Sequence, residues 1–142
     1  MADIISFDSG IKEFDVNGKV TVCFNPTDLA FIEKVYDLLE RMDKRNEKFT
    51  AEVNESDGRE LFEISHRFDN EAREELNSLF GDDVCTPLFG KMALNTIADG
   101  LPVWANFIFA VIDLFDESIK AERSKTNPRI QKYTEKYKNR KK

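Results

Sequence analysis

The sequence predicts a small α+β domain, mainly helical, in which an N-terminal β-hairpin is followed by a bundle of three to four helices. Asn17-Gly18 stands between two short stretches rich in apolar residues, which is a strong local signal for a hairpin. Beyond it, apolar residues recur at intervals of three and four, as on the buried face of a helix. The 142 residues, 41% of them hydrophobic and 12 of them Phe, suit one domain with a real core. We expect that domain to cover residues 1–124.

The hairpin is predicted over about residues 11–24, with two registers to choose between. A two-residue loop would pair Val16 with Lys19 and divide the apolar side chains between both faces. A three-residue loop, closed by a glycine bulge, would pair Phe14 with Val20. We favour the second register because it gathers the apolar side chains on one face, namely Phe14, Val20, Val22 and Phe24. A third short strand could precede the hairpin, at Ile4, Ile5 and Phe7.

Four helices are predicted, at about residues 26–47, 57–80, 91–99 and 102–124. Asn25 can cap the first helix, and Pro26 suits its first turn. Asp57, with a Glu three residues later, can begin the second helix, and Gly81 can end it in the left-handed conformation. The third helix is short, and Pro102 suits the first turn of the fourth.

The fourth predicted helix is the most apolar stretch of the chain. Between Val103 and Ile112 the only polar residue is Asn106. A helix that is apolar around most of its girth needs neighbours on several sides. We therefore expect it to lie at the centre of the bundle, or to be covered in part by a partner chain. The apolar run falls short of the ~20 residues that span a bilayer, so no membrane insertion is predicted.

Four large side chains are candidate contacts with a partner or with a second copy of the chain: Phe31, Leu38, Trp104 and Phe109. Three of them, Phe31, Leu38 and Phe109, fall outside the main apolar stripes of their helices. The single Trp offers a large apolar contact on the last helix. Such side chains could cover a helical client through helix-in-groove contacts. The alternative is that they complete the core.

Charge is unevenly distributed along the chain. Residues 125–142 hold eight basic side chains and one acidic side chain, a net +7, so the rest of the chain carries −13 and the total is −6. The acidic body argues against binding to nucleic acid. We expect this basic tail to dock on an acidic partner or to stay disordered. Its Ile130, Tyr133 and Tyr137 are also compatible with a short amphipathic helix.

No pattern of catalytic, cofactor-binding or metal-binding residues is recognisable, so we do not expect an enzyme. His66, the single histidine, is expected to be a solvated surface residue. Cys23 is expected to be a buried thiol in a strand. With Cys85 it makes no disulfide framework, although a Cys–His pair formed in three dimensions stays open. No secretory signal is seen, so a reducing cytoplasm is the expected setting.

A short motif in the middle of the chain closes the second predicted helix. It consists of Leu79, Phe80, Gly81 and Asp82, followed by a second Phe-Gly pair at Phe89 and Gly90. This arrangement resembles the tail assembly chaperones of long-tailed, siphovirus-like bacteriophages and prophages. The hairpin before the motif is similar, as are the apolar helix and the basic Asn-Pro-containing tail after it. The chain differs from that family in its longer N-terminus and in its Trp- and Phe-rich last helix.

The resemblance implies a protein without catalytic activity or cofactors. Members of that family bind the tape measure protein in the cytoplasm of the bacterial host, keep it soluble and help the tail tube protein assemble around it. They leave before the virion is complete. From the apolar surface we further expect a homo-oligomer, without nucleic-acid or membrane binding. Two other classes stay open: a small interaction or regulatory protein that acts through self-association, and a small enzyme.

Overall fold

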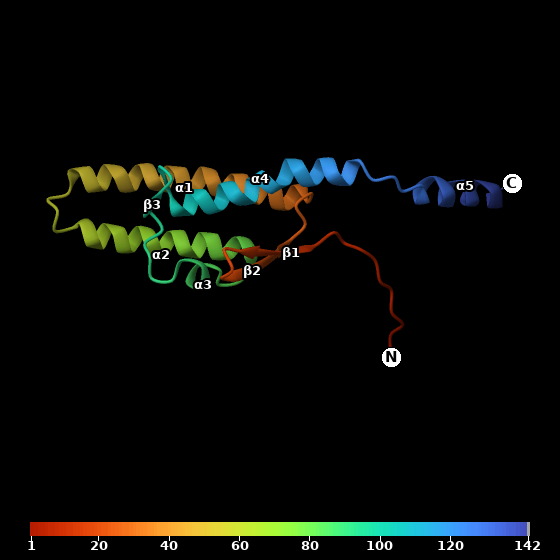
Figure 1. Ribbon diagram of the computed structural model, residues 1–142, viewed down its shortest axis with the longest axis horizontal. Helices are drawn as coiled ribbons and strands as arrows, with labels where there is room; N and C mark the ends of the chain where they lie inside the picture. Colours follow the sequence, from red (N-terminus) through yellow and green to blue (C-terminus); the bar gives the residue numbers. More distant parts are fainter. Residues whose placement is uncertain (142) are drawn as a thin grey trace.

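The structure is a computed structural model that describes residues 1–141, with side chains described up to residue 140. Its elements are β1 (Lys12–Val16), β2 (Val20–Phe24), α1 (Leu29–Glu55), α2 (Leu61–Phe80), α3 (Cys85–Phe89), β3 (Ile97–Ala98), β4 (Leu101–Pro102), α4 (Val103–Arg123) and α5 (Arg129–Lys141). Figure 1 shows α1 and α2 antiparallel to each other, with α4 running alongside α1 in the opposite direction. The β1–β2 hairpin lies beside the end of α2. The predicted fold class, mainly helical α+β with an N-terminal hairpin, is confirmed.

The hairpin keeps the predicted face but not the predicted pairing. Phe14 lies opposite Val22, and Val16 lies opposite Val20, so the predicted pair of Phe14 with Val20 is wrong by two residues. A shift of two leaves every side chain on its face, because strand side chains alternate with a period of two. The loop has three residues, as predicted, and Asn17 and Gly18 both take positive φ angles, 55° and 67°. The inward face buries Val22 and Phe24 against the helices.

Residues 1–11, which we call the N-terminal arm, form no strand, so the predicted third strand is wrong. The chain turns away from the hairpin at Gly10, whose φ is +75° and whose N–H donates to Asp8 Oδ1 at 2.8 Å. Asn25 Nδ2 donates to the carbonyl of Ser9 at 3.0 Å and fixes this turn to the body. The segment beyond the turn therefore leads away from the sheet edge instead of pairing with it (Figure 1).

The first two helices begin later than predicted. Asp28, and not Asn25, caps α1: its side chain accepts from the N–H of Ala30 at 3.0 Å, while Asn25 holds the preceding turn through Thr27. The Asp57 side chain accepts from the N–H of Arg59, which precedes α2, and so does not cap that helix. In contrast, Gly81 ends α2 in the left-handed conformation, as predicted, with a φ of 72°.

Helix α1 also continues past its predicted end at 47 and through the polar stretch that follows. Phe49 packs on Phe68 of α2 with 5.0 Å between ring centroids. Near the same level, Glu52 forms an ion pair with Arg67. Tertiary contacts with α2 thus extend α1 to Glu55, in a region where its own sequence is weakly patterned.

The helix predicted at 91–99 is wrong. The short helix of this region is α3, and residues 90–94 form a loop fastened to α2. Arg73 donates to the carbonyls of Gly90 at 2.8 Å and Met92 at 2.7 Å, and its partner Asp69 accepts from the N–H of Leu94 at 2.7 Å. Leu94, the last residue of this loop, is fully buried. A tight β3–β4 hairpin then follows, with positive φ at Asp99 and Gly100.

The core is rich in aromatic rings. A connected set of phenylalanines joins the hairpin, the start of α1, the end of α2 and the middle of α4, and consists of Phe14, Phe24, Phe31, Phe80, Phe107 and Phe115. Helix α4 buries six residues, more than α1 or α2, and leaves Phe109 and Ala110 exposed. None of the helices within residues 1–141 is long and apolar enough to cross a bilayer. Helix α5 follows Asn127-Pro128 and stands apart from the bundle (Figure 1).

Candidate binding groove

Two adjoining hollows lie between the β1–β2 hairpin and α4. One has a volume of about 340 Å³ and reaches from the hairpin turn to Leu88, Phe89 and Met92. The other has a volume of about 250 Å³ and reaches along the hairpin to Phe14, Phe24 and Leu114. Both are lined by Val16, Asn17, Phe107 and Ala110. We call the two hollows together the hairpin–α4 groove.

The floor of the groove follows from the periodicities of the two elements that form it. Phe14 and Val16 face inward from β1, because they share the parity of the buried side chains. On α4, Val103, Phe107 and Ala110 recur at helical spacing and line one side. Among them Ala110 is small and exposed, so it leaves open the space that a larger side chain would fill.

Polar groups are confined to the rim of the groove. Asp15, Asn17 and Lys19 stand at the hairpin end. On the other side, Asn106 Nδ2 donates to the carbonyl of Ala98 at 2.8 Å and so fixes the β3–β4 hairpin against α4. An apolar floor with a few polar groups at its edge is the usual composition of sites that bind apolar ligands or apolar faces of peptides.

The family-like motif supports this floor from behind. The Phe107 ring lies 5.9 Å from that of Phe80 and 6.2 Å from that of Phe89, measured between centroids. These two phenylalanines belong to the motif, which extends from Leu79 through Gly81 and Asp82 to Gly90. The motif therefore positions α3 and its ring beneath the groove, and it is structural in this respect.

Asn77 and Asp83 hold the turn between the two halves of the motif. The Asn77 side chain accepts from the N–H groups of Val84 at 2.8 Å and Cys85 at 3.0 Å, and donates to Asp83 Oδ1 at 3.1 Å. Asp83 also accepts from the N–H of Thr86 at 3.1 Å. Hydrogen bonds from Thr86, and then from Asn77, hold the pKa of Asp83 below its ordinary value, because they stabilise the carboxylate.

The four predicted contact residues differ in how far they are buried. Leu38 is completely buried and Trp104 is 3% exposed, so both belong to the core and not to the surface. Phe31 is half-buried and stacks on Phe24 with 4.6 Å between centroids. Only Phe109 of the four lies at the surface, with 37% of its area exposed, next in sequence to the groove residue Ala110. The sequence analysis missed Ala110, although it is a small residue in a run of large ones.

The single histidine and the two cysteines lie on three different elements, α2, β2 and α3. His66 is exposed on α2, as predicted. The predicted burial of Cys23 is wrong, because strand alternation places it opposite to Val22 and Phe24, on the solvent side. Cys85 is buried, and burial raises the pKa of its thiol to about 11. Within residues 1–141, no group of three or more His, Cys, Asp or Glu side chains is placed to hold a metal ion.

Comparisons with protein families, with characterised proteins and with solved structures find no match for this chain. The fold and the groove define a small, mainly helical α+β protein with an apolar groove between its hairpin and α4.

Proposed function

We propose that the protein is a tail assembly chaperone of a long-tailed bacteriophage or prophage. In this role it binds an apolar helical segment of the tape measure protein, keeps that protein soluble and assists assembly of the tail tube protein around it. It acts by binding alone, in the cytoplasm of the bacterial host, and leaves before the virion is complete. The observation that carries the proposal is the hairpin–α4 groove, which is lined by Phe89 of the family-like motif and whose floor residue Phe107 packs on Phe80 of the same motif.

The composition of the groove suits an apolar helix. An amphipathic helix binds in such a groove by inserting side chains from one face into apolar hollows. Met92, which lines the larger hollow, is 44% exposed. Ile97 and Leu101 of the β3–β4 hairpin, the sequence neighbour and the strand partner of the lining residue Ala98, are 73% and 40% exposed. Phe109 adds an aromatic ring on the same helix as Ala110. These side chains would widen the apolar contact beyond the groove itself.

The charge of the chain suits a protein that keeps an apolar client in solution. The body carries −13, and many of its acidic side chains lie on the outer faces of the helices. A complex that covers the groove would leave this charge exposed. Repulsion between such complexes would oppose their aggregation.

Co-expression with the tape measure protein tests the proposal, the expected client being encoded just downstream of this protein's gene. The wild-type protein should keep the tape measure protein soluble and co-purify with it. Ala110→Glu should lower the soluble yield about tenfold, because a carboxylate on the floor of the groove would lose its hydration when the client binds. Ala121→Glu makes the same change at an exposed position of α4 outside the groove and should leave the yield unchanged.

Two results would contradict the proposal. If the tape measure protein is equally soluble without its partner, the protein is not its chaperone. If Ala110→Glu and Ala121→Glu support the same yield as wild type, the groove is not the binding site. In the first case the self-associating regulatory protein becomes the better interpretation.

A further inference from the structure

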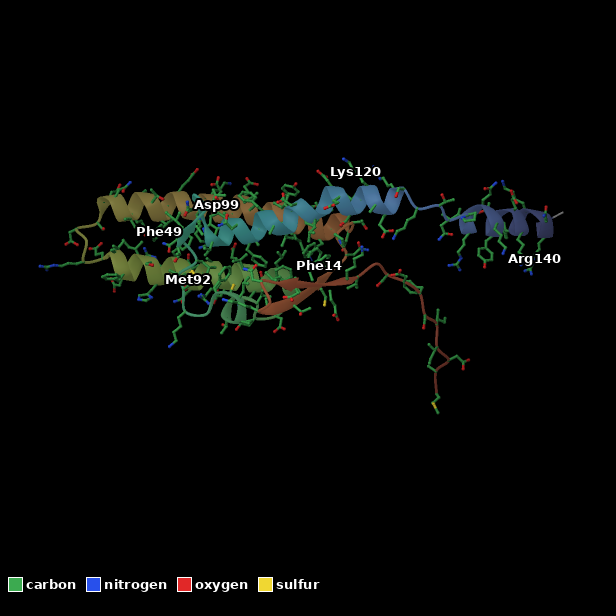
Figure 2. The ribbon with its side chains drawn as sticks, viewed as in Figure 1. Phe14, Phe49, Met92, Asp99, Lys120 and Arg140 are labelled. Atoms are coloured by element: carbon green, nitrogen blue, oxygen red, sulfur yellow. The ribbon has the colours of Figure 1, made fainter. Side chains whose placement is uncertain are left out.

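The N-terminal arm exposes large apolar side chains that no described part of the chain covers. Ile4, Ile5 and Phe7 are 90%, 91% and 84% exposed, and Ile11 at its root is 63% exposed. Figure 2 shows the side chains of the arm standing clear of the body. Clusters of exposed apolar residues on a soluble protein commonly mark a surface that another polypeptide covers.

The root of the arm is fixed at the open end of the hairpin, where β1 begins and β2 ends. Asn25 approaches Gly10 so closely that a Cβ at this position would lie 2.4 Å from Asn25 Nδ2, and the φ of +75° also favours glycine. This anchor sits where β1 begins, whereas the groove extends from Val16 and Asn17, where β1 ends, along the hairpin to Phe24, which pairs with Lys12. From the anchor the arm leads away from both the hairpin and α4 (Figure 1).

The arm and the groove match in pattern. In an extended segment, Ile5 and Phe7 point to the same side and their side chains are about 7 Å apart. The groove offers two adjoining apolar hollows. Asp3 and Asp8 flank the apolar part of the arm, and the rim of the groove carries one charge of each sign, Lys19 and Asp15, of which Lys19 can pair with a carboxylate of the arm.

We propose that the N-terminal arm of one copy docks in the hairpin–α4 groove of a second copy, with Ile5 and Phe7 in the two hollows. Phe7 and Ile5 lie three and five residues before the anchor at Gly10, so an extended arm carries them about 10 and 17 Å from it, and the second copy's groove must open within that distance. The exchange is then reciprocal and closes a two-fold dimer. The arm covers the groove until a client displaces it; this last step rests on the proposed function, whereas the dimer does not.

Sedimentation velocity on the purified protein, without client, tests the exchange. The wild type should be a dimer. Phe7→Asp in the arm and Ala110→Glu in the groove should each weaken the dimer at least about tenfold, because each places a carboxylate in an apolar contact. The matched controls are Phe62→Asp, at a 71% exposed Phe of α2, and Ala121→Glu. Both controls should leave the dimer intact, and unchanged circular dichroism should show that all four variants fold.

Cysteine cross-linking distinguishes exchange between copies from folding back within one copy. In a Cys23→Ser background, separately purified Phe7→Cys and Ala110→Cys proteins are mixed and oxidised. We expect a disulfide-linked heterodimer. The remaining thiol, Cys85, is buried and will not compete. A disulfide that forms within one chain of the Phe7→Cys, Ala110→Cys double variant, without the heterodimer in the mixture, would overturn the proposal.

The exchange and the proposed function fail in different ways. A monomeric wild type that still keeps the tape measure protein soluble would overturn the exchange alone. A dimer that dissociates with Phe7→Asp, but captures no tape measure protein, would overturn the proposed function alone. If both are right, Phe7→Asp should capture at least as much client as wild type, because no arm competes for the groove.

Discussion

The N-terminal arm and the hairpin that follows it contain the same kinds of residue, yet only the hairpin is buried. Phe24 is 5% exposed in β2, whereas Phe7 is 84% exposed in the arm. The hairpin has Asn17-Gly18 to reverse the chain and a helical face to pack against. The arm has a turn at Gly10 that directs it away from both. Apolar composition therefore does not decide burial by itself; the turn that precedes or follows the segment does.

This contrast also separates two kinds of aromatic residue. The six connected phenylalanines of the core contribute to folding of one chain, because each lies within 4.6–6.3 Å of another, measured between ring centroids. The ring of the arm can contribute only when a second molecule covers it. Stability should thus depend on protein concentration through the arm and not through the body.

The largest expected effect is that of Phe24→Ala. This change removes a ring stacked between Phe14 and Phe31 and should lower the free energy of unfolding by about 3–5 kcal/mol. Phe7→Ala, measured at a dilution where the protein is monomeric, should change it by less than about 0.5 kcal/mol. Urea unfolding followed by circular dichroism measures both. Equal effects of the two changes would erase the distinction between body and arm.

A second contrast lies between polar contacts of the body. Arg73 and Asp69 form a 2.8 Å ion pair with both side chains 18% exposed, and Arg73 also bonds two carbonyls of the 90–94 loop. Lys44 and Glu40 form a pair at 3.3 Å with side chains 73% and 68% exposed. Water competes for the second pair and much less for the first.

Arg73→Ala should therefore lower the free energy of unfolding by about 2 kcal/mol, because it leaves Asp69 and two carbonyls short of a donor. Lys44→Ala should change it by less than about 0.5 kcal/mol. Unfolding in urea again provides the measurement, and amide exchange should show the 90–94 loop opening only in the Arg73 variant. A loop that stays protected would mean that burial of Leu94 holds it without the arginine.

The parts of the fold that were predictable depend on chemistry within a few residues. Gly81 ends α2 because a left-handed residue is needed there, and Pro102 precedes α4 because its fixed φ and missing N–H suit a helix start. The alternation of apolar side chains predicted which face of the hairpin points inward. It could not predict which residues pair across the two strands, because a shift of two residues preserves the same face.

The prediction of a helix at residues 91–99 failed because residues far away in sequence hold this segment in a loop. Its Met92 carbonyl accepts from Arg73 and its Leu94 N–H donates to Asp69, and ten residues separate the end of their helix from the segment. Asp99-Gly100 carries the same turn signal as Asn17-Gly18, but the two-residue strands beside it are too short to show alternation. The local pattern therefore gave no reason to prefer a turn to a helix end.

The groove was the least predictable feature. Leu38 lies off the main stripe of α1 but is fully buried, since α1 packs against both α2 and α4. Which face of a helix lies at the surface therefore depends on how the helices pack together, and not only on the apolar stripe of that helix. The hollow at Ala110 depends in turn on a small side chain opposite the hairpin, and only the placement of the hairpin over α4 reveals it.

The smallest expected effect concerns the other end of the chain. Ile130 of α5 is 83% exposed, and the tail is joined to α4 through exposed residues 124–128, so its helix should contribute little to the stability of the body. Removal of residues 125–142 should change the free energy of unfolding by less than about 0.5 kcal/mol. It also removes a net charge of +7 and leaves a body with a net charge of −13.

If the tail lay against the acidic surface of its own body, the truncated protein would be distinctly less stable than the full chain at low salt, and the difference would vanish at high salt. Equal stability of the two proteins in both salts would instead leave α5, like the arm, available to a partner.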